Sequence, residues 1–151
     1  MGVRDVFDNG ILRVQVPPGW KLFYGIDSQG NPSPKKLHIY KNAQEEADIL
    51  THAGITVCFF DRQDTYCSPK FFYDNVKDIE AFPLGAYTWQ GYTCTSFGYP
   101  YTMLEAEDKG CVFQVMILMK NGEREISLHD ADVKIILESL TQANEQGGIL
   151  L

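Results

Sequence analysis

The residues best suited to do chemistry in this chain are one cysteine and two aspartates that follow an apolar segment. Asp61, Asp64 and Cys67 come after Ile55–Phe60, and the ends of strands often carry functional side chains. A cysteine thiolate that is activated by a histidine and oriented by a carboxylate is a nucleophile for covalent catalysis. No local signature of a cysteine enzyme surrounds Cys67, so a solvated loop is the competing interpretation.

Other groups that could act as bases or metal ligands are scattered along the chain. His38, His52 and His129 fall on different predicted elements and lack the short spacings typical of zinc ligands. Glu105 and Glu107 share one strand face beside a turn, where two carboxylates can do acid–base work or bind a hard cation. A charged, solvent-facing edge is the simpler interpretation. Glycine-rich phosphate-binding motifs are absent, so the sequence predicts no catalytic residue, no metal site and no cofactor.

The candidate binding residues are aromatic. We select Trp89, Tyr92, Tyr99 and Tyr101, which lie with Phe97 within thirteen residues and around predicted turns. Tyrosine and tryptophan suit protein interfaces because one end of the side chain is apolar and the other can form a hydrogen bond. A turn cannot easily bury both Tyr99 and Tyr101, so we expect a protein-binding surface around them. The alternative is that these rings lie beneath helices that cover a sheet.

The elements that must position these residues are mostly strands. Cys111–Met119 is apolar at every position except Gln114, which indicates a strand that is covered on both faces. Turn signals at 108–110 and 121–122 predict hairpins, and Gln90-Gly91 is interpreted as a further hairpin turn. The other predicted strands are Ile11–Val16, Trp20–Ile26, Leu37–Lys41, Ile55–Phe60, Ala86–Trp89, Tyr92–Phe97 and Tyr101–Glu107.

Two segments have the spacing of amphipathic helices. Ser68-Pro69 is a typical helix start, and the apolar residues after it predict a helix over 69–80. These residues are Phe72, Val76 and Ile79. A second apolar stripe, from Val133 to Leu140, predicts a helix over 128–142. The segment 42–54 is ambiguous: it could form a short helix or a strand connection with a bulge.

Together these elements predict an α+β fold. Hairpins make the sheet mainly antiparallel, and its most apolar strands need cover on both sides. We therefore expect a single-domain α/β/α sandwich, with the mainly antiparallel sheet covered by helices on both faces. The domain is expected to span 1–144 and to be followed by a flexible C-terminal tail, 145–151.

The composition restricts the partner and the compartment. The chain has 151 residues, a formal net charge of −7 and a sequence pI of about 4.8, which argues against nucleic acid and anionic membranes but suits a basic protein surface. No apolar run approaches the roughly 18 residues of a membrane span, so no membrane insertion is expected. No signal peptide is visible, and the four cysteines favour free thiols over two disulfides. These features predict a cytoplasmic location, with a removed signal or an upstream domain left open.

Short motifs in the chain resemble those of the PsbP/Mog-type superfamily. Val14–Trp20 is similar to the opening strand and Pro-x-Gly-Trp turn of that family, and Ile135–Leu140 is similar to its closing helix. The hairpin at Gly91-Tyr92 is also similar in place. Pro17, Gly19, Trp20, Ser139 and Leu140 carry the likeness. The resemblance implies an α/β/α sandwich and a non-catalytic binding or assembly role, as in oxygen-evolving-complex subunits, a protein that binds the GTPase Ran, and bacterial relatives of unassigned function.

The leading functional hypothesis is a non-catalytic binding or adaptor domain that recognises a protein. Two alternatives are kept. One is an enzyme whose site assembles from Cys67, Asp61 and a distant histidine, and the other is a structural or assembly subunit that associates with itself.

Overall fold

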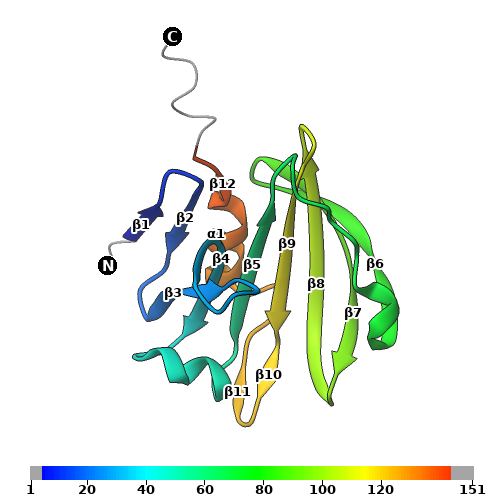
Figure 1. Cartoon of the computed structure of the whole chain (residues 1–151). Helices are drawn as coiled ribbons and strands as arrows, with labels where there is room; N and C mark the ends of the chain where they lie inside the picture. The colour runs from blue at the N-terminus through cyan, green and yellow to red at the C-terminus, as the bar shows by residue number, and fades with distance from the viewer. Residues whose placement is uncertain (1–4, 144–151) are drawn as a thin grey trace.

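The computed structural model describes residues 5–143, which are built mainly from antiparallel strands (Figure 1). Seven of them form the main sheet, in the order β3-β4-β5-β9-β8-β7-β6, and all neighbours are antiparallel. These strands are β3 (Trp20–Ile26), β4 (Pro32–Lys41), β5 (Gly54–Phe60), β6 (Asp74–Leu84), β7 (Tyr87–Ser96), β8 (Tyr99–Asp108) and β9 (Cys111–Leu118).

Smaller elements complete the described part of the chain. A three-stranded sheet contains β1 (Asp5–Asp8), β2 (Leu12–Val16) and β12 (Thr141–Gln142), and a two-stranded ribbon contains β10 (Lys120–Asn121) and β11 (Arg124–Glu125). The helical elements are the α-helix α1 (Ala131–Ser139) and the 3₁₀ turns η1 (Glu46–Leu50) and η2 (Lys70–Phe72). Within residues 5–143, no helix has the length and apolar character needed to cross a membrane.

One face of the main sheet, the covered face, carries the larger hydrophobic core. Leu37, Val57, Val115 and Leu104 are paired across four successive strands and are fully buried. α1 and β2 pack against this face, and α1 lies behind the sheet in the view of Figure 1. They add Val133, Ile136, Leu137, Leu12 and Val14 to the same core. Fully burying an aliphatic side chain contributes about 2 kcal/mol, so this layer is the main source of stability.

The opposite side of the sheet, the open face, has no α-helix against it in the described residues. His38, Thr56, Met116, Met103 and Tyr92 are paired across five successive strands and lie on this side. The segment 61–73, which we call the crossing loop, passes over this face from the end of β5 to the start of β6 at the sheet edge. The prediction that β9 is buried on both faces is therefore largely confirmed, but on the open face the crossing loop takes the place of the expected helix.

The predicted α/β/α sandwich is wrong, because the segment 69–80 is not a helix. Ser68-Pro69 opens only the short turn η2, and the chain then enters β6. Two register shifts in the pairing of β6 with β7 disturb the alternation of inward and outward side chains. The residues of β6 that reach the core, Ile79, Phe82 and Leu84, are consequently spaced by three and then two positions. Of the predicted helical stripe only Ile79 packs against this core, whereas Phe72 and Val76 are exposed, so the helix-like spacing did not mark a buried face.

The hairpin predicted at Gln90-Gly91 is also wrong. Both residues lie inside the continuous strand β7, and the real turn is Phe97-Gly98, where both residues have positive φ. A Cβ at Gly91 would lie 2.0 Å from the Met103 carbonyl oxygen, so this glycine permits close approach of β7 and β8. The hairpins at 108–110 and 121–122 and a helix within 128–142 are confirmed. The ambiguous segment 42–54 contains the 3₁₀ turn η1 and ends at the first residue of β5. The predicted tail, 145–151, lies outside the described residues.

Candidate functional site

The four aromatic residues selected from the sequence divide between the two faces. Trp89 lies on the covered face with no exposed surface, and its Nε1 donates a hydrogen bond to the Leu84 carbonyl oxygen (3.2 Å). Tyr92, Tyr99 and Tyr101 lie on the open face, on the neighbouring strands β7 and β8. The structure therefore brings three of the four candidates to one surface, and assigns Trp89 to the core.

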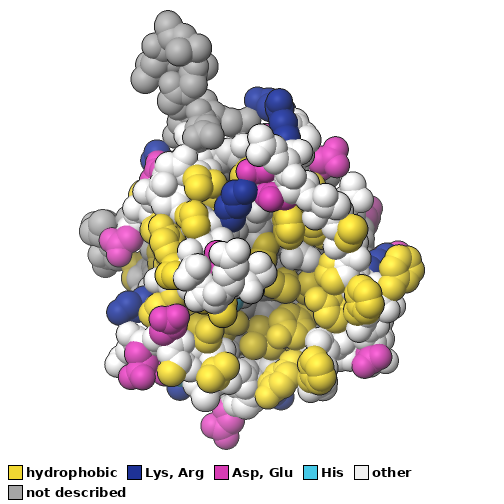
Figure 2. Space-filling view, viewed as in Figure 1, with side chains coloured by type: hydrophobic (Ala, Val, Ile, Leu, Met, Phe, Trp, Pro, Cys, Tyr) yellow, Lys and Arg dark blue, Asp and Glu magenta, His cyan; other side chains and the backbone are white. Residues whose placement is uncertain are grey.

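The centre of the open face is an apolar trough. Tyr92, Cys94 and Met103 form a buried cluster of their own, separate from the main core. Tyr73, Tyr101 and Met116 pack against the cluster, and a small cavity of about 80 Å³ lies between several of these side chains. Figure 2 shows hydrophobic side chains gathered on a hollowed part of this surface. Methionine side chains adapt to different partners, which suits a binding surface.

Large aromatic side chains are exposed where the crossing loop and the β7–β8 turn border the trough. We call Phe71, Phe72, Phe97 and Tyr99 the aromatic rim; the first three are 94%, 87% and 98% exposed. Phe97 also has a φ of +50°, a conformation that costs an ordinary L-residue about 1–2 kcal/mol. Asparagine, aspartate or glycine would fit this turn position better. An exposed ring at a strained backbone position contributes little to stability, which favours a role in binding.

A polar pocket of about 270 Å³ lies beside the trough, and we call it the Glu105 pocket. Its polar lining comes from both the crossing loop and the sheet: Ser68, Lys70, Asp78, Gln90, Tyr92 and Glu105. The Tyr66 hydroxyl donates a hydrogen bond to the Glu105 carboxylate, and the Gln114 amide donates to the Tyr66 hydroxyl at 3.5 Å. The Tyr66 ring packs on Phe60, which fixes the loop over this end of the sheet.

Burial suppresses ionisation of the tyrosines and cysteines on the open face. It raises the pKa of Tyr92 to about 12, and raises the pKa of Tyr66 further still, with the neighbouring Glu105 carboxylate as a second cause. The pKa values of the Cys58 and Cys94 thiols are also raised by burial. These groups are therefore neutral near pH 7, and the two thiols are poor nucleophiles.

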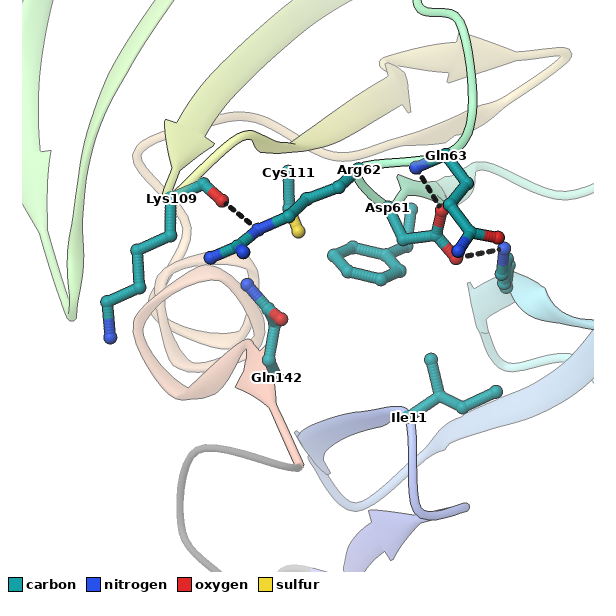
Figure 3. Close-up of a pocket in the computed structure, with 9 residues that line it drawn as sticks. Ile11, Asp61, Arg62, Gln63, Lys109, Cys111 and Gln142 are labelled. Atoms are coloured by element: carbon teal, nitrogen blue, oxygen red, sulfur yellow. Dashed lines mark hydrogen bonds and ion pairs between the residues drawn. The ribbon is translucent and has the colours of Figure 1, made fainter. Parts of the chain in front are cut away.

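A separate cleft of about 540 Å³ lies at the end of β5, between the crossing loop, β9 and β12 (Figure 3). Lys35 pairs with Asp61 at 2.7 Å, which raises the pKa of the lysine and lowers that of the carboxyl group. The Nε of Arg62 donates to the Lys109 carbonyl oxygen at 2.7 Å, and Figure 3 shows Arg62 and Gln142 approaching from opposite sides. Lys35, Asp61 and Arg62 of this cleft are therefore already engaged in contacts within the protein.

The proposed cysteine site is not brought together in the described residues. Cys67 is exposed on the crossing loop and does not line the cleft that contains Asp61. None of His38, His52 and His129 lines that cleft either, and burial lowers the pKa of His38. All four cysteines are free thiols, as the sequence favoured. No group of three or more potential metal-ligating side chains gathers anywhere in residues 5–143.

Comparison with known proteins assigns no family. No protein-family model matches the chain, and no curated protein is significantly similar to it. The resemblance to the PsbP/Mog-type superfamily stays a prediction.

Several residues of the open face were not selected from the sequence. Glu105 was interpreted as part of a solvent-facing edge, yet it is half-buried and hydrogen-bonded to Tyr66. Phe71 and Phe72 follow Ser68-Pro69 and were both placed in the predicted helix over 69–80, with Phe72 on its apolar stripe. The sequence did offer one indication that these residues lie in a loop. The segment before them, 61–69, is polar and contains a proline, which fits a loop as well as a helix start.

Proposed function

We propose that this chain is a non-catalytic binding domain that recognises a partner protein through the open face around Tyr99 and Tyr101. The observation that carries the proposal is the exposed aromatic rim beside a trough of buried tyrosine and methionine side chains. Contiguous exposed apolar surface marks interaction sites in proteins that otherwise bury such groups. Aromatic rings next to a desolvated pocket are the usual centres of binding energy in protein interfaces.

The geometry favours an extended segment of a partner. The trough lies over β7, β8 and β9 beside the crossing loop, and Tyr99 is exposed further along β8, so a segment lying along β8 would contact both the trough and the aromatic rim. Cys94 and Tyr92 form its floor, while Tyr99 lies at one end with 44% of its surface exposed. Rings at such a rim lose little conformational entropy on binding because tyrosine and phenylalanine have only two side-chain torsions.

The proposal is tested by selecting random 12-residue peptides displayed on phage against the purified protein. We expect saturable binders whose affinity falls at least tenfold with Tyr99→Ala/Tyr101→Ala, the loss expected for interface anchors. Ile26→Ala/Leu50→Ala is the matched control, because Ile26 and Leu50 are also exposed apolar residues but lie on other elements. Equal losses for both double variants, or no saturable binder, would contradict the proposal.

The same variants separate partner binding from self-association. Solution mass is measured at several protein concentrations for the wild-type chain and for Tyr99→Ala/Tyr101→Ala. A monomer at all concentrations supports a different protein as partner, whereas a dimer that the double variant dissociates would assign the open face to a second copy and overturn the proposal.

A further inference from the structure

Two polar groups in the Glu105 pocket have incomplete bonding. The Tyr92 side chain is 3% exposed, and its hydroxyl is buried without a hydrogen bond of good geometry; the Ser68 side chain lies near it and opposes the rise in pKa that burial causes. The Glu105 carboxylate accepts a hydrogen bond from Tyr66 but has no lysine, arginine or histidine within 4.0 Å among the described residues. A buried hydroxyl without a partner is unfavourable, and a half-buried carboxylate without a neighbouring cation is incompletely compensated, so both groups favour a ligand that would complete them.

Lys70 shows which chemistry the pocket accepts. Its ammonium group lies 5.4 Å from the centroid of the Tyr92 ring and 2.5 Å from a carboxylate oxygen of Asp78. The ring face of Tyr92 therefore already attracts one cation, as the quadrupole of an aromatic ring does in general. Lys70 is paired with Asp78, and Glu105 has no cation of its own.

We propose that the Glu105 pocket receives an arginine or lysine side chain of the partner segment; this inference rests on the proposed function of the open face. A guanidinium or ammonium group would donate to the Glu105 carboxylate and to the Tyr92 hydroxyl oxygen. The net charge of −7 adds long-range attraction for a basic segment.

The strand geometry also sets the spacing of the anchors in the partner. Met103 and Glu105 lie on the same face of β8, two residues apart, which corresponds to about 7 Å along a strand. Met103 belongs to the apolar trough and Glu105 to the polar pocket. An extended segment lying along β8 would therefore place an apolar side chain two positions from its basic residue.

The test uses peptides selected on phage against the wild-type protein. We expect arginine or lysine two positions from an apolar residue. Each arginine is then replaced by citrulline, or each lysine by norleucine, and dissociation constants are measured by fluorescence polarisation. The neutral replacement should weaken binding to the wild-type protein at least tenfold. Glu105→Gln should weaken the basic peptide at least tenfold and leave the neutral peptide unchanged within threefold.

Glu107→Gln is the matched control, because Glu107 lies on the same strand and face but is exposed and outside the pocket. It should change affinity by less than threefold. Glutamine at 105 keeps an oxygen that can accept from Tyr66, and Tyr92→Phe is a second variant that removes only the hydroxyl. Tyr92→Phe should weaken the basic peptide at least threefold.

The outcomes distinguish this inference from the proposed function. Peptides that depend on Tyr99 and Tyr101 but lack a basic residue, or that respond equally to Glu105→Gln and Glu107→Gln, would overturn the basic anchor and leave the binding face standing. Peptides that do not depend on Tyr99 and Tyr101 would overturn both.

Discussion

Replacing Phe97 by asparagine should stabilise the protein. Phe97 has a φ of +50° in the β7–β8 turn, and its side chain is 98% exposed. The left-handed conformation costs most L-residues about 1–2 kcal/mol, whereas asparagine adopts it readily. Because almost none of the ring is buried, the replacement loses negligible hydrophobic stabilisation. We expect the free energy of unfolding to rise by about 1 kcal/mol, which raises the Tm of a domain of this size by about 2–4 °C.

The assay is urea unfolding followed by tryptophan fluorescence, since Trp20 and Trp89 are both buried in the main core. Phe71→Asn is the matched control: Phe71 is 94% exposed, and its φ is not positive. The control should change stability by less than about 0.5 kcal/mol. An equal gain in both variants, or no gain for Phe97→Asn, would refute the argument from backbone strain. The stabilised variant should also bind the selected peptides more weakly, a common conflict between stability and function.

Two further predictions concern the sheet and its tyrosines. Gly91→Ala should destabilise the protein by about 3 kcal/mol, measured by the same urea unfolding, because the added Cβ meets the Met103 carbonyl oxygen at 2.0 Å; a loss below about 1 kcal/mol would show that the strands can separate. Burial raises the pKa values of five tyrosines in the folded state, namely Tyr40, Tyr66, Tyr73, Tyr92 and Tyr101. The unfolded chain, with pKa values near 10, therefore ionises first. The free energy of unfolding should be insensitive to these groups below about pH 9 and fall as the pH rises from about 10 toward the folded values, by up to about 1.4 kcal/mol per pH unit for each tyrosine; unchanged stability up to about pH 12 would contradict this.

The sequence predicted local features of the fold better than its layers. Turn chemistry at 108–110 and 121–122 and the apolar stripe from Val133 to Leu140 act over a few residues, and the structure confirms them. β6 was missed because its bulges are set by pairing with β7, which is a tertiary effect. Gly91 was misinterpreted because a glycine needed for close approach of strands cannot be distinguished locally from a turn glycine.

The candidate site was only partly accessible from the sequence for a similar reason. Exposure of Tyr99 follows from its place beside a turn, and the structure shows it. Burial of Trp89 depends on which face of β7 it occupies. Because the sequence analysis placed a turn at Gln90-Gly91, it could not recognise that Trp89 and Tyr92 lie on opposite faces of one strand. The contact between Tyr66 and Glu105 joins residues 39 positions apart through the crossing loop, so no local pattern encodes it.

The strand order has a consequence for how the chain folds. β3–β5 and β6–β9 are two consecutive meanders, and β5 pairing with β9 is the ladder that joins them, bringing Ile55 opposite Ile117. During synthesis, the apolar edge of β5 in the first meander therefore stays unpaired until β9, the last strand of the second meander, has been made. Pairings of such long sequence separation form slowly. The trough, the aromatic rim and the Glu105 pocket are all built from the crossing loop and the second meander, so the ladder between β5 and β9 completes the sheet beside the proposed binding surface without supplying any of its residues.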